Sequence, residues 1–439
     1  MSINKNQRFS VLFGNELRSK SPDIPQNATV CSFCGTDRDG QTSEIPLSED
    51  LLSKHLLFLG GIGTGKTNAF CQLLSQLTNN LSVDDMMIIF DTKGDFYREF
   101  YRPGDVVISN DDMSAGSLGL DYWNIFNELD KGTRLTESVI EISKALFADA
   151  CERTNQIFFP NAAKDLFMAC LLHFVRHYPL SQQTNINLVN YINASTSKAL
   201  REMVESYDDL RALGSYIAND DSPQTQGVLS ELQQVVREVF IGNFAKPGTL
   251  SLRDLVKRKG GIRVFVEYDL GIGRMLSPVY SLMFDMAIKE ALSRNRSEGN
   301  VYFITDEFKL LPYLSHIDDA VNFGRSLGIK FMVGVQNVEQ IYDNYGEERA
   351  RSILSGFMTS ICFRVNDAKS REYIQGLFGK NQKIETYMPT IQNRGMIETQ
   401  REANVVEDWD ITRLKIGEAI IGLPGYEPFV FQFDRYKER

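Results

Sequence analysis

Residues 55–67 read His-Leu-Leu-Phe-Leu-Gly-Gly-Ile-Gly-Thr-Gly-Lys-Thr, and this stretch decides the fold. Its apolar half predicts a short buried strand, and Gly60–Thr67 matches the complete pattern G-x-x-x-x-G-K-[ST]. Glycines let a backbone wrap phosphates with its N–H groups inward, and the helix that follows presents its positive end to the same phosphates. We expect Lys66 to reach the β- and γ-phosphates of ATP and the Thr67 hydroxyl to ligate Mg²⁺. The predicted nucleotide contacts are Gly60, Gly61, Ile62, Gly63, Thr64, Gly65, Lys66, Thr67 and Asn68.

The sequence after this loop predicts a βαβ unit. Residues 68–77 have helical spacing, and Met86–Phe90 is a second apolar run, which ends in Asp91-Thr-Lys-Gly-Asp95. Strand, glycine loop, helix and strand in this order imply a parallel sheet, so the fold class is α/β. Asp91 is interpreted as the start of a turn, in preference to a distant support for the metal.

Two acids follow a third apolar run, Val301–Thr305, and would lie at the end of a strand. A carboxylate in that position suits a nucleotide-bound Mg²⁺, and Asp306 takes this role. Glu307 would then orient or activate the attacking water. A solvated acidic pair in a turn is the competing interpretation, and the phosphate loop weighs against it.

Gln336 ends the next apolar run, Lys330–Val335, so its amide could touch the γ-phosphate or simply cap a strand. Arg325 lies on the far side of the helix-like stretch 317–326. From there it is badly placed for its own phosphate but could reach that of a neighbouring subunit; a surface ion pair is the alternative. Spacing alone does not decide either case.

Length and composition suit a soluble chain of two or three domains: 439 residues, 43% hydrophobic and 24% charged. Apolar runs stay below the roughly 18 to 20 residues of a membrane span, so a cytoplasmic protein is expected. The net charge of −10 repels nucleic acid as a whole, so DNA contacts would need local basic patches. The densest, Lys257-Arg258-Lys259, predicts either a pore loop or a solvated turn.

The middle of the chain, residues 129–245, is predicted to be an all-α insertion, because several helical periods occur there without a clear strand. Residues 130–245 carry 14 acidic and 10 basic side chains, which favours a surface for protein partners over one for DNA. The remaining segments, 46–128 and 246–439, would form one discontinuous α/β domain.

Residues 1–45 are expected to be a polar segment that contains Cys31 and Cys34. One CxxC is at best half of a zinc site, and neither His55 nor Cys71 supplies a second pair with ligand spacing. Two reduced thiols near a turn are the preferred interpretation, and a zinc shared with another chain stays open.

From residue 46 to 430 the chain resembles the coupling ATPases of type IV secretion, the TraD/TraG-like branch of the FtsK/HerA superfamily. The segment 301–336 is more specific to this branch than the phosphate loop. The resemblance rests on Gly60–Thr67, Ile89–Asp95, Tyr122-Trp-Asn124, Phe303–Phe308, Gly324–Gly328, Gly334-Val-Gln336, Tyr345-Gly346, Ile361–Arg364, Gly417-Glu-Ala419 and Pro424-Gly425.

The resemblance implies a RecA-like P-loop domain interrupted by an all-α domain, and a hexameric ring that threads DNA. It assigns Arg325 to the neighbouring subunit's ATP and Gln336 to sensing the γ-phosphate. Family members usually begin with membrane helices, which this sequence does not show, so membrane contact is expected only through a partner.

The leading hypothesis is therefore a DNA-stimulated ATPase that moves DNA, or a DNA–protein substrate, through a ring. Two alternatives stay open: an ATP-switched docking module, and the motor subunit of a defence or DNA-processing complex with a separate nuclease.

Overall fold

The computed structural model describes residues 8–110, 121–293, 298–311, 313–387 and 397–437. The chain divides into two compact units. The first comprises residues 1–81, 302–309 and 321–439, and the second comprises 82–301 and 310–320. The insertion at residues 129–245 and the α/β domain at 46–128 and 246–439 remain predictions, and this division into units follows other limits.

The first unit contains a sheet with the strand order β3-β2-β14-β13-β10-β4-β9-β8. Its centre is parallel, because β4 pairs in parallel with β10 on one side and with β9 on the other. Every residue of β4 is buried, which explains why its sequence is continuously apolar. The strand bounds are β2 Thr29–Asp37, β3 Thr42–Ser48, β4 Leu56–Leu59, β8 Val301–Thr305, β9 Ile329–Val335, β10 Thr359–Phe363, β13 Glu418–Gly422 and β14 Phe429–Phe433.

Helices accompany this sheet, and α2 follows β4 directly. Phe70 of α2 packs on Phe58 of β4, with ring centroids 4.2 Å apart. This contact fixes the start of α2 against the sheet. The helix bounds are α1 Glu49–Leu52, α2 Lys66–Asn80, α13 Glu339–Tyr345, α14 Glu347–Gly356, α15 Ala368–Phe378 and α16 Asp408–Thr412, with the 3₁₀ turn η5 Gly324–Leu327. The helix α12 Ile317–Phe323 and the 3₁₀ turn η4 Phe308–Leu310 each have residues in both units.

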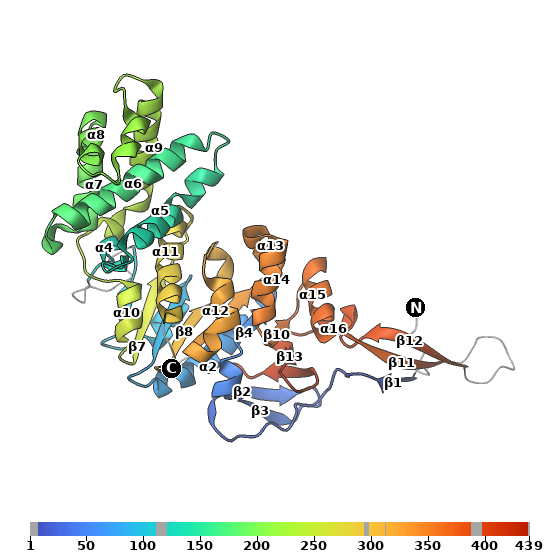
Figure 1. Cartoon of the computed structure of the whole chain (residues 1–439). Helices are drawn as coiled ribbons and strands as arrows, with labels where there is room; N and C mark the ends of the chain where they lie inside the picture. Colours follow the sequence, from blue (N-terminus) through green and yellow to red (C-terminus); the bar gives the residue numbers. More distant parts are fainter. Residues whose placement is uncertain (1–7, 111–120, 294–297, 312, 388–396, 438–439) are drawn as a thin grey trace. The chain divides into compact units, whose positions relative to one another are not determined.

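The antiparallel edge of the sheet was not predicted. Residues 1–45 were expected to be a polar segment, but β2 and β3 pair antiparallel there and join the sheet through β14. A separate three-stranded sheet, β1-β11-β12, comprises Arg8–Phe13, Lys380–Tyr387 and Ile397–Asn404 (Figure 1). Strand pairing between distant segments creates both features, and the local sequence carries little sign of it.

Cys31 and Cys34 are free thiols, and both belong to β2, which begins directly after a turn at residues 27–28. Cys31 is buried and Cys34 is exposed, so the two thiols do not converge on one point. His55 is buried, and its Nδ1 accepts a hydrogen bond of 3.1 Å from the Phe331 N–H. Among the described residues no group of three or more His, Cys, Asp or Glu side chains could hold a metal ion.

The second unit contains three parallel strands in the order β5-β7-β6 and a set of helices. The helical periods predicted within residues 129–245 are confirmed by α5, α6, α8 and α9 (Figure 1). None of the described helices, the 20-residue α6 and α11 included, is long and apolar enough to cross a bilayer. The bounds are β5 Met86–Asp91, β6 Val106–Ile108, β7 Ile262–Glu267, α3 Asp95–Phe100, α4 Ile125–Glu128, α5 Leu135–Glu152, α6 Phe158–His177, α7 Asn185–Ala194, α8 Ser197–Glu205, α9 Pro223–Val239, α10 Leu252–Arg258 and α11 Gly273–Leu292, with 3₁₀ turns η1 Leu180–Gln182, η2 Arg211–Ile217 and η3 Gly242–Ala245.

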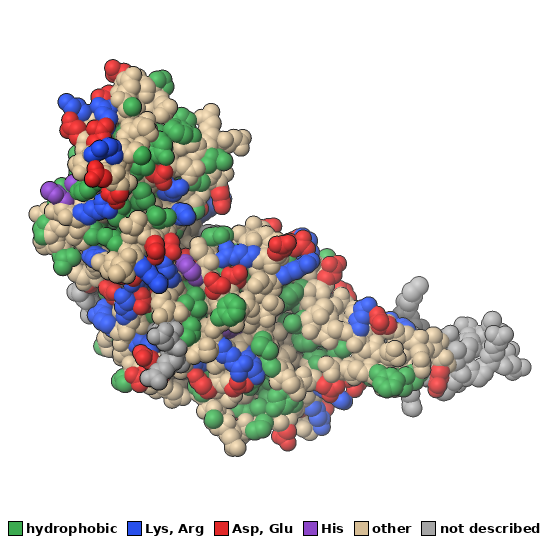
Figure 2. Space-filling model, viewed as in Figure 1, with side chains coloured by type: hydrophobic (Ala, Val, Ile, Leu, Met, Phe, Trp, Pro, Cys, Tyr) green, Lys and Arg blue, Asp and Glu red, His purple; other side chains and the backbone are tan. Residues whose placement is uncertain are grey.

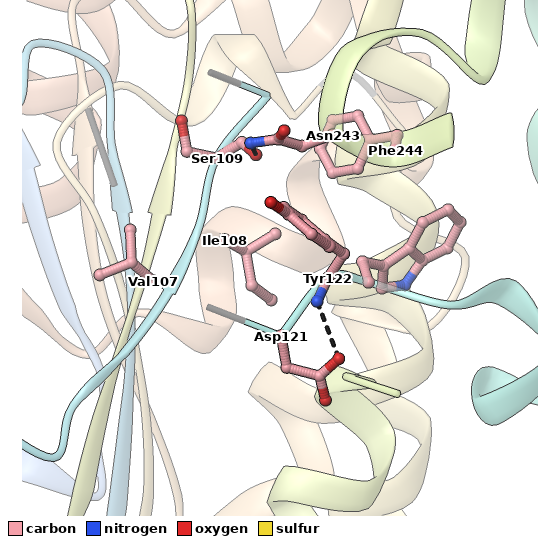
Figure 3. A pocket seen from close by; sticks show the side chains of 8 residues that line it. Val107, Ile108, Ser109, Asp121, Tyr122, Asn243 and Phe244 are labelled. Atoms are coloured by element: carbon pink, nitrogen blue, oxygen red, sulfur yellow. Dashed lines mark hydrogen bonds between the residues drawn. The ribbon is translucent and has the colours of Figure 1, made fainter. Parts of the chain in front are cut away.

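Buried polar side chains join residues 121–128 to residues 243–253 in the second unit. Asn185 donates 2.8 Å hydrogen bonds to the carbonyl oxygens of Trp123 and Phe244, and Asn124 donates to that of Gly248 at 2.9 Å. Figure 3 shows Tyr122 beside Asn243 and Phe244 in a small pocket at this junction. We call this group of bonds, together with those of Glu128 described below, the junction network.

Candidate nucleotide site

The phosphate loop connects β4 to α2 and has the backbone shape that its glycines predict. Gly63 and Gly65 adopt φ angles of +71° and +116°, which side chains other than glycine rarely accept. A Cβ on Gly60 would come within 2.6 Å of the Phe363 Cβ, and one on Gly65 within 2.9 Å of the Gly417 Cα. The glycines therefore permit both the curvature of the loop and its close packing.

The loop is supported from two sides by backbone hydrogen bonds. The Gly61 N–H donates to the Arg364 carbonyl at the end of β10, at 2.9 Å, and the Gly417 N–H donates to the Thr64 carbonyl at 2.8 Å. Neither Arg364 nor Gly417 has a role predicted from the sequence. The glycine itself was the signal in the sequence for Gly417, because its φ of +79° is a backbone conformation that other residues rarely adopt.

Lys66 is buried, and its ammonium group points back into the loop. Its Nζ donates to the carbonyl oxygens of Gly60, at 2.6 Å, and Gly61, at 3.1 Å. A buried cation inside a ring of glycine backbone fits an anionic phosphate chain. The loop tip is open, since Ile62 is 83% exposed.

The predicted metal ligands meet. The Thr67 Oγ1 donates a hydrogen bond of 2.8 Å to Oδ2 of Asp306, which follows β8. A hydroxyl and a carboxylate at this distance are the oxygen ligands that Mg²⁺ prefers, so the residues present fit a magnesium ion. Asp306 can approach because β9 has glycine at position 334, where a Cβ would lie 2.2 Å from the Asp306 carbonyl oxygen.

Glu307 and Gln336 also meet, with the Gln336 Nε2 donating to the Glu307 Oε2 at 2.5 Å. The other carboxylate oxygen of Glu307 is buried and has no hydrogen-bond partner among the described residues. Burial raises the pKa of Glu307, while the hydrogen bond from Gln336 and the charge of Lys66 lower it. A carboxylate with one free oxygen and a raised pKa is suited to accept a proton.

Asn68 and Arg325 lie outside this cluster of contacts. The Asn68 side chain makes two hydrogen bonds with the C-terminal segment. Its Nδ2 donates to the Asp434 carbonyl at 2.9 Å, and its Oδ1 accepts from the Tyr436 N–H at 2.8 Å. The Arg325 side chain is 53% exposed and forms an ion pair with Asp50 of its own chain. An exposed pair of this kind contributes about 0 to 1 kcal/mol, so Arg325 can exchange its partner at little cost.

The basic cluster at residues 257–259 is not uniformly open to solvent. Lys259 ends α10 with a φ of +51°, is buried, and donates its ammonium to the Glu298 carbonyl oxygen. Lys257 lies 3.8 Å from Glu290, and Arg258 is exposed. Only Lys257 and Arg258 therefore have the exposure that contact with another molecule requires.

Asp91 organises a turn, as the sequence suggested. Its carboxylate accepts hydrogen bonds from the N–H groups of Lys93, at 3.2 Å, and Tyr97, at 2.8 Å. Burial raises the pKa of Asp91, and these hydrogen bonds lower it. One Asp91 oxygen thus holds the turn before α3, and the other holds the first turn of that helix.

Comparison with known proteins places this geometry in a family. The family model described as the type IV secretion-system coupling protein DNA-binding domain matches residues 40–431. The coupling protein TraD of Escherichia coli (strain K12) is 23% identical and aligns with 85% of this chain and 50% of its own length. The coupling protein VirD4 of Bartonella henselae is 22% identical, and the alignment covers 93% of this chain and 66% of VirD4. The chain thus spans half of TraD and less than two thirds of VirD4.

Among solved structures, the unbound bacterial conjugative coupling protein TrwB superposes with a TM-score of 0.77 at 19% sequence identity. The alignment covers 100% of this chain and 98% of the TrwB chain. TrwB complexes with the ATP analogue ADPNP and with ADP and Mg²⁺ each have a TM-score of 0.73. This likeness confirms the predicted α/β fold, a RecA-like P-loop domain with helical regions. Because the family model covers most of the sequence, the chain belongs to the type IV secretion-system coupling protein family defined by that DNA-binding domain.

Proposed function

We propose that this chain is an ATP-hydrolysing motor that moves DNA, or a DNA–protein substrate, as part of a ring. The observation that carries the proposal is the 2.8 Å hydrogen bond between Thr67 and Asp306, two residues far apart in the sequence. It joins the phosphate loop to the strand-end acid in the way that a shared magnesium ion requires. The reported complexes of TrwB with ADPNP and with ADP and Mg²⁺ support the same choice of ligand.

In this proposal each residue of the site has one role. The backbone of residues 60–67 binds the phosphates, Lys66 exchanges the glycine carbonyls for the β- and γ-phosphates, and Thr67 and Asp306 hold Mg²⁺. When bound, Mg²⁺ neutralises phosphate charge. Glu307 takes a proton from the attacking water through its free oxygen, and Gln336, bonded to Glu307, senses the γ-phosphate.

The proposed ring is supported by the position of Arg325, whose exposed side chain pairs with Asp50 and not with the phosphate loop. We propose that a neighbouring subunit presents its phosphates to Arg325, which then leaves Asp50 and stabilises negative charge in the transition state. A hexamer is the proposed assembly. Its proposed setting is the cytoplasm, with any membrane contact made through a partner.

DNA is the proposed substrate of the motor, supported by the description of the family. At a net charge of −10, binding depends on local groups, and Lys257 and Arg258 are the proposed contacts. We further propose that the helical insertion receives accessory proteins or protein substrates.

The test is ATP hydrolysis by purified protein of measured mass, with and without single- and double-stranded DNA. Lys66→Ala should weaken nucleotide binding and stop hydrolysis. Glu307→Gln should bind nucleotide normally but hydrolyse it about 10²- to 10⁴-fold more slowly, since an amide cannot take the proton. Glu348→Gln, an exposed acid of α14, serves as the control. Wild-type turnover in both site variants would refute the ATPase, and a monomer indifferent to DNA would favour the docking module over the motor.

A further inference from the structure

The two edges of the parallel sheet in the first unit hold different parts of the proposed ATP site. Asp50 in α1 precedes β4 and Arg325 in η5 precedes β9, and because β4 and β9 are parallel neighbours, both residues lie at the amino edge. Gly61 follows β4 and Arg364 follows β10, so both lie at the carboxyl edge, where the Gly61 N–H donates to the Arg364 carbonyl at 2.9 Å. For Arg325 to reach the phosphates of a neighbouring subunit, the amino edge of one subunit must meet the carboxyl edge of the next.

The Asp50 carboxylate offers one oxygen to each of two cations. Its Oδ2 lies 2.7 Å from the Lys54 Nζ, and its Oδ1 pairs with Arg325. The hydrogen bond and charge of Lys54 lower the pKa of Asp50 most, and Arg325 lowers it further, so the group is ionised at neutral pH. When Arg325 moves to a phosphate, Lys54 stays and the Oδ1 atom of Asp50 becomes free for another cation.

Arg364 supplies a cation at the opposite edge. Its side chain is exposed and makes no ion pair or hydrogen bond with the part of the chain that the structure describes. Within one subunit it is out of reach of Asp50, because the four residues of β4 alone hold the two edges about 13 Å apart. A guanidinium group binds carboxylate oxygens with charge-assisted hydrogen bonds, so Arg364 of a neighbouring subunit suits the freed oxygen of Asp50.

An exposed apolar side chain accompanies the charged group at each edge. Phe323, two residues before Arg325, is 70% exposed, and Ile62, next to Gly61 in the phosphate loop, is 83% exposed. Figure 2 shows acidic and basic side chains interspersed on the face in view, so charge complementarity between two copies has to be local. An apolar residue beside a charged one suits contact with a protein surface better than contact with a small ion.

We propose that ring assembly makes Asp50 exchange one arginine for another: Arg325 leaves it for the neighbour's phosphates, and Arg364 of the same neighbour replaces Arg325. Phe323 and Ile62 are covered in the same contact. The inference rests on the proposed function, from which it takes the trans role of Arg325, and it adds a reciprocal contact. Because Asp50 keeps two cations throughout, Arg325 reaches the phosphates without loss of an ion pair.

Reversal of the two charges tests this pairing. The mass of the full chain is measured against protein concentration with ADPNP and Mg²⁺ present, and the concentration at half assembly is compared between variants. Asp50→Arg and Arg364→Asp should each raise that concentration about tenfold or more, because each brings like charges together. The double variant should return to within about threefold of the wild type, because it restores the pair with the charges exchanged.

Two matched controls carry the same kinds of change at other positions. Glu398→Arg, at an exposed position of β12, should leave assembly unchanged. Lys415→Asp, which removes an exposed cation two residues before Gly417, should not restore the assembly of Asp50→Arg. Circular dichroism checks that each variant is folded. Rescue by Lys415→Asp in place of Arg364→Asp would overturn the inference.

Crosslinking gives an independent measurement. A short bis-maleimide is used, because an arginine and an aspartate that form an ion pair stand further apart than a disulfide allows. In a Cys34→Ser background, chosen because native Cys34 is exposed, Asp50→Cys combined with Arg364→Cys should give covalent multimers, and either change alone should not.

The outcomes separate this inference from the proposed function. If the wild type assembles and hydrolyses ATP but the variants show neither rescue nor crosslinks, the reciprocal contact is wrong and the motor stands. Loss of nucleotide binding in Arg364→Asp, with no rescue by Asp50→Arg, would also overturn the inference, because Arg364 would then serve its own phosphates. A wild type that stays monomeric with ADPNP and DNA would refute the ring and the reciprocal contact together.

Discussion

Replacing Glu128 with glutamine tests the junction network at its most buried point. The carboxylate is fully buried, and each of its oxygens accepts two hydrogen bonds. Oε1 accepts from the Trp123 Nε1 and the Leu252 N–H, both at 2.9 Å, and Oε2 accepts from the Ser251 hydroxyl at 3.0 Å and the Arg253 N–H at 3.2 Å. All four donors point at the carboxyl group, and none of them carries a charge.

The magnitude at low pH follows from these contacts. A glutamine oxygen at the Oε1 position keeps two bonds, and the Ser251 hydroxyl can turn to accept from the new amide. The Arg253 N–H alone then loses its acceptor, and a buried unsatisfied N–H costs about 1 to 3 kcal/mol. Glu128→Gln should therefore destabilise the second unit by that amount below pH 5.

The free energy of unfolding of the wild type should also depend on pH through Glu128. Burial raises the pKa of Glu128 from 4.5 to about 7, although its hydrogen bonds lower it. An acid whose pKa is raised by folding binds its proton more tightly in the folded state. Its contribution is therefore complete below pH 4.5 and is lost as the pH rises through about 7. The loss amounts to about 3 kcal/mol, and glutamine, which does not titrate, escapes it. The difference between wild type and Glu128→Gln should shrink by up to this amount between pH 5 and pH 8.

Urea unfolding at several pH values measures this difference. The chain has two tryptophans, so a Trp409→Phe background leaves Trp123, which contacts Glu128 directly, as the only reporter. Glu137→Gln, at an exposed position of α5, is the control and should parallel the wild type. If the curves of wild type and Glu128→Gln also run parallel from pH 5 to 8, Glu128 does not change its proton occupancy on folding and the reasoning is refuted.

Two more predictions concern the motor. Arg325→Ala and Lys66→Ala should each be nearly inactive alone, but mixed subunits should recover some ATPase activity, because some interfaces pair an intact loop with an intact arginine; no recovery after verified mixing contradicts the trans role. Reversing the charge of Lys257 and Arg258, with buried Lys259 unchanged, should make the negative slope of log affinity for DNA against log salt shallower by about 2 and leave basal ATP hydrolysis intact. An unchanged slope would remove both residues from the DNA path.

The elements predicted from sequence are those whose signal is local. Residues 56–59 are continuously apolar because β4 lies between two other strands, and the acids at 306 and 307 follow a strand of the same kind. Parallel strands end at one edge of a sheet, which is why Asp306 and Glu307 could be expected near Thr67 before any coordinates were known.

Features that depend on distant partners could not be predicted. Strand β2 mixes buried and exposed positions in an irregular pattern, and its pairing with β3 and β14 decides its conformation. The burial of Lys259 depends on the Glu298 carbonyl, 39 residues away in the chain. Likewise, Asn185 and Glu128 look like ordinary polar residues in the sequence, and only the folded chain shows that they satisfy buried backbone groups.

The groups expected to meet phosphate already have partners inside the protein. Lys66 binds the carbonyls of Gly60 and Gly61, and Gln336 binds Glu307. A bound nucleotide would therefore replace these hydrogen bonds with its own. Only the difference in free energy between the new and the old hydrogen bonds would contribute to nucleotide affinity. The exchange also suits a sensor. Two residues after Gln336, the Val338 N–H donates to the Ser370 hydroxyl of α15 at 3.0 Å, so a shift of Gln336 toward a γ-phosphate has a short covalent and hydrogen-bonded route to that helix. In the proposed sensor role of Gln336, arrival and loss of one phosphate would change the contacts of Glu307 and act on the Val338–Ser370 hydrogen bond in the same step.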